Sequence, residues 1–421
     1  MTGGRPPATV DREGHTSLLL RGARVVTPPE GTGYLRGAEL GGLERVEGVD
    51  ILVRAGRIAA IEPGIAPPSG CRVVEAEGRT VVPGFVDAHT HACWAGSRLD
   101  EWEARLGGAG YSELLAAGGG ILSTVRAVRG SSEVGLAAAL RVGLGWMLQE
   151  GTTAVEVKSG YGLDVEGELK MLRAIRRAAQ DWPGRVRATA CIGHALDPEA
   201  SDPVGRTIEE VLPAVNREFP GVTIDAYCEE GAWSVEACVR LFEAARALGH
   251  PLRIHADQFN ALGMLEEAVR LGARSVDHLE GSTPEGLRVL AGSRSAGVVL
   301  PVSGFHLDGR YADARAFVDA GGAAVVATNW NPGSAPSPSI PFALALAVRH
   351  CGLTPAEALS AATWNAAQLL DFADAGAVAA GRRADLVLLR HRDERELAHT
   401  VGGRPVLAVV CGGRLVESTG P

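Results

Sequence analysis

The stretch PGFVDAHTHACWAGSR, residues 83–98, decides the fold. Its apolar first half is typical of a short buried strand, and two histidines, His89 and His91, stand at the end of that strand. Side chains at positions i and i+2 of a strand point to the same side, so the two imidazoles converge on one point. Such a pair suits a metal at the carboxyl end of a barrel strand. Two histidines satisfied by ordinary hydrogen bonds would give the same pattern.

Working outward, the chain from about residue 80 to 370 alternates apolar runs with amphipathic runs. The expected strands are Val81–His89, Thr153–Ser159, Arg187–Gly193, Thr223–Glu229, Leu252–Asp257, Ser275–Leu279, Gly297–Ser303 and Ala323–Thr328. The expected helices between them include Glu133–Gln149, Glu166–Gln180, Ser234–Leu248, Leu262–Leu271 and Ala312–Ala320. Eight strand–helix units over about 250–300 residues predict a (β/α)8 barrel of the TIM type. A doubly wound open sheet is the alternative, but no GxGxxG motif follows the first strand.

The two ends of the chain have a different sequence pattern, in which short apolar runs are separated by Gly and Arg. These runs are Ser17–Val26, Val49–Ile61 and Arg72–Ala76 near the start, and 384–390 and 405–416 near the end. They predict a small β-sandwich domain built from both termini. We expect residues 1–79 and 373–421 to form that domain, with 1–16 a disordered leader, and residues 80–372 to form the barrel.

Composition limits the class of protein. The 421 residues carry 41 Lys+Arg against 50 Asp+Glu, a net charge of −9, and no basic cluster, which argues against a nucleic-acid partner. No window offers the apolar length of a membrane span, and the polar N-terminus resembles no secretory signal. Seven scattered cysteines without a CxxC pair support neither a disulfide framework nor a zinc ribbon. We therefore expect a cytoplasmic protein without membrane or nucleic-acid partners.

Further histidines, His194, His255 and His278, fall at or just after other expected strand ends. Around them lie the motifs GSR at 96–98, EVKSGYGLD at 156–164, GHALDP at 193–198, CEEGAWS at 228–234, HADQF at 255–259, DHLEG at 277–281 and NPGS at 331–334. In this order they resemble the imidazolonepropionase family of the amidohydrolase superfamily. The resemblance runs from about residue 17 to the C-terminus.

The resemblance implies a hydrolase of cyclic amide C–N bonds that acts in histidine degradation. Its substrate would be 4-imidazolone-5-propanoate and its product N-formimino-L-glutamate. It also implies one Zn²⁺ or Fe²⁺/Fe³⁺ per subunit, and we expect a homodimer.

Carried over residue by residue, the resemblance makes His89, His91 and His255 the metal ligands. Arg98 would bind the substrate propionate, and an arginine fork does suit a carboxylate. The remaining implied substrate contacts are Tyr161, His194, Asn331, Gly333 and Ser334. The alternatives are that Arg98 forms a surface salt bridge, that Tyr161 packs on the barrel rim, and that residues 331–334 are a simple turn.

Two positions bear on proton transfer. Gln258 stands where family members carry Glu or Gln; it can orient a substrate but cannot carry a proton. His278 then becomes the expected acid/base or oxyanion partner. Glu229 and Glu230 could orient ligands or lie on a solvated rim, and a single-metal site gives Lys158 no bridging role.

One position departs from the family pattern. The eighth strand should end in an aspartate that serves as the fourth metal ligand, but this chain has Asn329. An amide has the shape of the acid without its charge, so Asn329 can ligate only weakly and cannot accept a proton from water. An engineered Asp→Asn change, a weakened natural paralogue and an active enzyme with another base such as His278 all fit.

Two rival functions stay open at this point. The first is a different amidohydrolase or deaminase that acts on a heterocyclic base, for which Arg98 would have no carboxylate to bind. The second is a barrel that binds a ligand without turnover because of Asn329.

Overall fold

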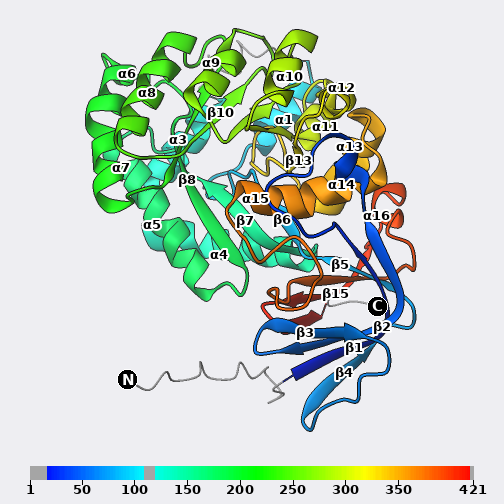
Figure 1. The fold of residues 1–421 in the computed structure, drawn as a ribbon. Helices are drawn as coiled ribbons and strands as arrows, with labels where there is room; N and C mark the ends of the chain where they lie inside the picture. The colour runs from blue at the N-terminus through cyan, green and yellow to red at the C-terminus, as the bar shows by residue number, and fades with distance from the viewer. Residues whose placement is uncertain (1–16, 109–118, 418–421) are drawn as a thin grey trace.

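The computed structural model describes residues 17–108 and 119–417, so the leader expected at residues 1–16 lies outside the described residues. Eight parallel strands form one sheet in chain order, and helices surround it, as Figure 1 shows. The strands are β6 (Phe85–Asp87), β7 (Thr152–Lys158), β8 (Arg185–Gly193), β9 (Thr223–Cys228), β10 (Leu252–Ala256), β11 (Ser275–His278), β12 (Ala296–Val299) and β13 (Ala324–Val326). The predicted TIM-like barrel is confirmed.

The barrel closes between its first and last strands just beyond their carboxyl ends. The backbone N–H of Asn329 donates to the carbonyl of His89 at 3.0 Å, and the N–H of His91 donates to the carbonyl of Trp330 at 2.9 Å. This seam fixes the position of Asn329 beside the two histidines that follow β6.

The helices lie outside the barrel and in its loops. They are α1 (Leu99–Leu106), α3 (Ile121–Gly130), α4 (Glu133–Gln149), α5 (Val165–Asp181), α6 (Pro203–Arg206), α7 (Leu212–Glu218), α8 (Val235–Ala247), α9 (Met264–Leu271), α10 (Pro284–Ala291), α11 (Pro301–His306), α12 (Ala314–Asp319), α13 (Ile340–His350), α14 (Pro355–Ser360), α15 (Ala366–Leu369) and α16 (Glu396–His399). Short helical turns η1 (Gly37–Gly41), η2 (Thr207–Val211) and η3 (Ala361–Asn365) complete the set.

Most expected strands differ from the observed ones by one to three residues in their limits, and two differ in kind. The strand expected over Gly297–Ser303 ends at Val299, and the rest is helix α11 with Pro301 in its first turn. Proline suits a first helical turn because its missing N–H would be unbonded there anyway. The strand expected over Val81–His89 is two strands, β5 (Thr80–Pro83) and β6.

The break between β5 and β6 takes the chain from one sheet to another. β5 pairs with β1 (Ser17–Thr27) and β14 (Leu386–Leu389), whereas β6 pairs with β7 in the barrel. Gly84 lies at the crossing, where a Cβ atom would stand 2.2 Å from the hydroxyl oxygen of Thr153. Only glycine permits this approach, and it sets the entry angle of β6.

The remaining strands form a mixed eight-stranded sheet from both ends of the chain, where blue and red strands lie together in Figure 1. They are β1, β2 (Glu44–Arg54), β3 (Arg57–Glu62), β4 (Cys71–Glu75), β5, β14, β15 (Val406–Cys411) and β16 (Arg414–Glu417). Side chains of β2 and β14, such as Ile51 and Leu386, share one buried cluster although three ladder steps separate these strands. The sheet therefore curls around its own core, as the predicted sandwich requires.

Across the described residues, 17–108 and 119–417, no helix combines the length and the apolar character that a bilayer crossing demands.

Candidate active site

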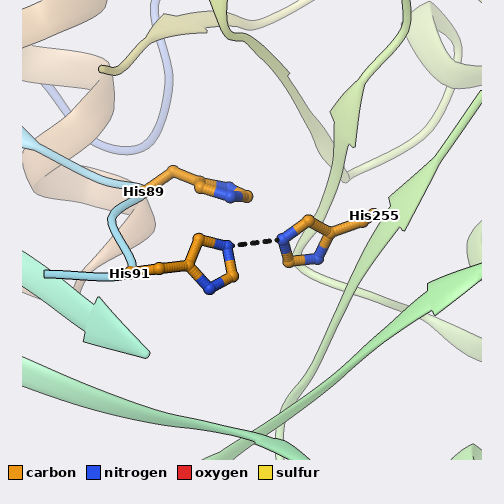
Figure 2. A group of neighbouring side chains, drawn as sticks. All are labelled: His89, His91 and His255. Carbon is orange, nitrogen blue, oxygen red and sulfur yellow. Dashed lines mark hydrogen bonds between the residues drawn. The ribbon is translucent and has the colours of Figure 1, made fainter. Parts of the chain in front are cut away.

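Three histidines meet at the carboxyl end of the barrel. His89 and His91 follow β6, and His255 lies on β10; Figure 2 shows their rings turned toward one another. One ring nitrogen from each lies within 4.8 Å of the other two, and Nε2 of His91 is 3.1 Å from Nε2 of His255. All three side chains are buried. The structure thus brings together residues that lie up to 166 positions apart in the sequence.

Two aspartates fix the outer sides of these rings. Nδ1 of His89 lies 2.6 Å from Oδ2 of Asp277, and Nδ1 of His255 lies 3.0 Å from Oδ1 of Asp225. A carboxylate accepts, so each Nδ1 donates and the Nε2 lone pair is left for another partner. Neither aspartate is among the residues expected at the site.

The nitrogen set fits a metal cation. Nε2 of His89 is buried without a hydrogen-bond partner. Burial lowers the pKa of His89 and of His91 well below the usual range, and neighbouring cationic groups lower both further. Neutral imidazoles with free lone pairs are the form that ligates Zn²⁺ or iron.

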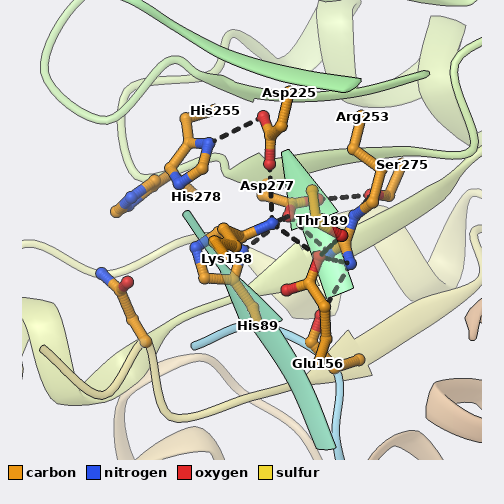
Figure 3. Close-up of polar contacts among 12 residues, drawn as sticks. His89, Glu156, Lys158, Thr189, Asp225, Arg253, His255, Ser275, Asp277 and His278 are labelled. Carbon is orange, nitrogen blue, oxygen red and sulfur yellow. Dashed lines mark hydrogen bonds and ion pairs between the residues drawn. The ribbon is translucent and has the colours of Figure 1, made fainter. Parts of the chain in front are cut away.

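Beneath the histidines lies a layer of paired charges, drawn in Figure 3. The Lys158 ammonium donates to Glu156 at 2.9 Å and to Asp225 at 2.6 Å. The Arg253 guanidinium donates to Glu156 at 2.9 Å and to Asp277 at 2.5 Å. Every member is buried, so this layer, which we call the lower layer, anchors the aspartates that hold His89 and His255.

Alternation along the strands explains the lower layer. Glu156 and Lys158 are two apart on β7, and Arg253 and His255 are two apart on β10, so each pair shares the inner face of the barrel. Burial would raise the pKa of Asp225, but His255 and Lys158 hold it well below the usual range. The Asp225 carboxylate therefore stays ionised next to the histidines.

Asn329 follows β13 with φ of 54°, a left-handed conformation that asparagine tolerates better than most residues. Its Nδ2 donates to the hydroxyl of Ser303 at 2.8 Å, and its Oδ1 is buried without a hydrogen-bond partner. The position expected for a fourth ligand thus carries a free buried oxygen beside the backbone of His89, but a neutral one.

Aromatic rings line one side of the histidine cluster. The His194 ring stacks on His91 with centroids 4.6 Å apart, and its Nδ1 lies 3.0 Å from the carbonyl of Gly160. Burial lowers the pKa of His194 to about 3. The Tyr161 ring lies 6.0 Å from His91 and 5.2 Å from His194, and burial raises the pKa of its phenol. Both expected substrate contacts are therefore beside the histidines.

Gln258 lies on the same rim, just past β10. Its Oε1 accepts from the hydroxyl of Tyr227 at 2.9 Å. Glu229 accepts from the backbone N–H of Phe259 and from the Asn260 side chain, both at 2.8 Å. Glu229 therefore braces the loop that carries Gln258 and contacts none of the three histidine rings in the described hydrogen bonds.

Arg98 and the loop of residues 331–334 lie next to each other. The Arg98 guanidinium donates from Nη2 to Glu101 at 2.6 Å, and its Nε is buried without a partner. A Cβ atom on Gly333 would lie 3.1 Å from Nη1 of Arg98. The Asn331 amide is used within its loop, since Oδ1 accepts from the N–H groups of Gly333 and Ser334, both at 2.8 Å.

His278 ends β11 next to the cluster, with its ring centroid 5.7 Å from that of His255 and 6.1 Å from that of His89. The expected site residues are thus assembled at one end of the barrel. Sequence reasoning missed Asp225, Asp277, Glu280 and Tyr227. One sequence feature could have pointed to the two aspartates: both lie on the inner face of the strands that flank His255, Asp225 on β9 and Asp277 on β11.

Comparison with known proteins agrees with this assembly. Residues 80–416 match the model of the amidohydrolase family. An imidazolonepropionase of Rubrobacter xylanophilus is 44% identical over 411 residues, which is 95% of this chain and 99% of the relative. One of Deinococcus radiodurans is 44% identical over 391 residues, 93% and 97% of the two chains.

Solved structures share the fold at low identity. A triazine hydrolase variant superposes with a TM-score of 0.71 at 20% identity over 96% of each chain. A 5-methylcytosine deaminase of Klebsiella pneumoniae gives 0.72 at 17% identity, with 96% and 98% covered. The superfamily is metal-dependent, and the three histidines suit that chemistry. On the sequence relatives, the chain belongs to the amidohydrolase family and, within it, to the imidazolonepropionases.

Proposed function

We propose that this chain hydrolyses the ring amide C–N bond of 4-imidazolone-5-propanoate to give N-formimino-L-glutamate, a step of histidine degradation. The observation that carries the proposal is the set of three converging imidazoles, two of them braced by aspartates, beside an arginine with a free buried Nε. The near full-length similarity to imidazolonepropionases supports the same reaction.

His89, His91 and His255 would hold one Zn²⁺ or iron ion, with Asn329 Oδ1 as a weak fourth ligand. Such an ion, when bound, lowers the pKa of a coordinated water from 15.7 to about 7 and polarises a carbonyl. Both metals accept imidazole ligands, and the donor set favours neither.

The chain's own residues position the substrate. Arg98 binds the propionate carboxylate with its guanidinium, which Glu101 orients by accepting from Nη2. Tyr161 and His194 form the wall against which the flat ring lies, and Gln258 is oriented by Tyr227. Asn331 shapes the loop by bonding Gly333 and Ser334, and this loop brings Gly333 next to Arg98. Fixing a small substrate in this way removes much of the entropic barrier.

His278 handles the protons. As water adds to the ring carbonyl carbon, one O–H bond breaks and its proton passes to His278. As the C–N bond breaks, the proton returns from His278 to the leaving ring nitrogen, so His278 ends unchanged. Gln258 cannot share this task because an amide does not titrate in water.

The substrate assignment is tested by Arg98→Met, with loss of imidazolone absorbance as the assay. We expect KM to rise by about 100-fold, because a carboxylate loses a charge-assisted partner. Arg270→Met is the matched control, since Arg270 also pairs with a glutamate three residues away but lies on the outer helix α9. An unchanged KM in Arg98→Met would contradict 4-imidazolone-5-propanoate as the substrate and would favour a heterocyclic base. The homodimer and the cytoplasmic location expected from the sequence stay predictions.

A further inference from the structure

His278 and Glu280 form a buried imidazole–carboxylate pair beside the three histidines. Nδ1 of His278 lies 3.2 Å from both carboxylate oxygens of Glu280. The two side chains are only 3% and 5% exposed. Because an ionised carboxylate only accepts, the proton of a neutral His278 ring sits on Nδ1, and Nε2 carries the lone pair.

The backbone that makes this pair is unusual. His278 and Leu279 have φ of 95° and 75°, and neither is glycine. Left-handed backbone is costly for such residues and persists only where surrounding contacts impose it. Here the N–H of Gly281 donates to the carbonyl of Asp257 at 2.6 Å, and the Ser282 hydroxyl donates to the Asp257 carboxylate at 2.7 Å. This reversal brings the Glu280 carboxylate back onto the ring two residues before it.

Glu280 also differs from the other acids near the cluster. Asp225 and Asp277 each contact both a histidine and a cation of the lower layer. Within the described residues, the Glu280 hydrogen bonds go to His278. Its carboxylate is thus placed to act on the His278 ring alone. Burying a charged carboxylate costs free energy, so we expect this pairing to serve a role.

We propose that Glu280 is a positioning residue that holds His278 in the Nδ1–H tautomer, so that Nε2 is the nitrogen that accepts and returns the proton. The inference rests on the proposed function only for the identity of the reaction, because the tautomer is a property of the protein itself. A ring with the opposite tautomer presents an N–H where a lone pair is needed, and so cannot accept the first proton.

The first test is kinetic, on the zinc-loaded protein with imidazolone propionate. Glu280→Met removes the acceptor at similar size, and we expect kcat to fall by about 10–100-fold with KM within about twofold. Glu285→Met is the control, since it makes the same change at an exposed glutamate of α10, and its kcat should stay unchanged. If Glu280→Met does not fold, Glu280→Gln, which keeps an acceptor oxygen, should lose about tenfold in kcat. Unchanged kcat in the folded variants would overturn the proposal.

The second test reads the tautomer directly by ¹⁵N NMR of histidine-labelled, zinc-loaded protein. The His278 signals are assigned by their loss in His278→Gln. We expect the Nδ1–H pattern in the unaltered protein and its loss in Glu280→Met. An Nε2–H pattern in the unaltered protein would overturn the proposal. Absence of ring opening together with the Nδ1–H pattern would overturn the proposed substrate and still support Glu280 as the residue that positions His278.

Discussion

The two sides of the histidine cluster differ in how their polar atoms are used. In the lower layer, Glu156, Lys158, Asp225, Arg253 and Asp277 each have a partner of opposite charge within 2.9 Å. The other side faces the carboxyl ends of the barrel strands, and we call it the mouth side. There, Nε2 of His89, Oδ1 of Asn329 and Nε of Arg98 are buried without partners. Buried polar groups normally find partners within the protein, and in the lower layer only Oε2 of Glu156 has none. We therefore expect a cation and a substrate to contact the unpaired atoms of His89, Asn329 and Arg98.

The difference separates two kinds of function. The lower layer is a scaffold whose charges satisfy one another and hold the imidazoles in place. The mouth side keeps its lone pairs and donors for a cation and a substrate. Changes in the scaffold should therefore act on stability, and changes at the mouth should act on metal affinity and turnover.

The largest effect is expected at the mouth from His89→Ala. Removing one of three strong ligands should reduce bound metal to a trace and lower turnover by about 10³-fold or more, because the cation contributes several kcal/mol. Elemental analysis and the imidazolone assay measure the two quantities. Full metal content in this variant would contradict the claim that the mouth side binds the cation.

The scaffold is tested by Lys158→Met. It leaves the carboxylates of Glu156 and Asp225 without their shared cation, so the free energy of unfolding should fall by about 3–5 kcal/mol. Urea denaturation measures it, and Lys170→Met, at the only other lysine of the chain, should cost about 1 kcal/mol. Equal losses from both lysines would refute the scaffold role.

Asn329→Asp tests whether position 329 on the mouth side contributes a metal ligand. A carboxylate beside His89 adds charge that a cation favours, so metal affinity should rise by about 10–100-fold. Competition with a chelator measures this affinity. Gln258→Glu is the control, because it adds the same charge next to Tyr227 and should tighten binding less. A rise in turnover along with affinity would identify Asn329 as a weakened ligand, and no rise in affinity would contradict its placement as a ligand.

The smallest effect is a pH dependence carried by His194. Burial lowers its pKa to about 3, whereas an unfolded histidine titrates near about 6.5. Below pH 6.5 the unfolded chain binds a proton that the folded chain does not, so this residue's contribution to stability falls as pH falls. Between pH 6.5 and 4.5 the metal-free protein should lose about 1.4 kcal/mol more per pH unit than His194→Phe, which keeps a ring against His91. Parallel stability curves from denaturant unfolding would rule this out.

Much of the fold could be predicted because its signals are local. The helix expected at Glu133–Gln149 has those limits in the structure, and the Ser132 hydroxyl that caps it is visible in the sequence. The split of the first expected strand could not be predicted, since β5 and β6 have similar apolar sequences and differ only in which strands they pair with.

In the site, too, local sequence patterns could be predicted and long-range pairing could not. The convergence of His89 and His91 could be predicted from strand alternation, and that of His255 and Asn329 from the common end of barrel strands. The partners of Asp225 and Asp277 could not, because neither aspartate bonds the residue opposite it in the sheet. Asp277 lies opposite His255 but bonds His89, and Asp225 lies opposite Arg253 but bonds His255. The use of Asn331 within its own loop likewise depends on contacts that the sequence pattern does not reveal.

The most direct test of the central claim is an anomalous-scattering map from a crystal of the metal-loaded protein, recorded at the absorption edge of the bound metal. We expect one peak per chain, about 2.0–2.1 Å from a ring nitrogen of His89, of His91 and of His255. A peak at another place, or a site that leaves any of these three rings unbound, would contradict it.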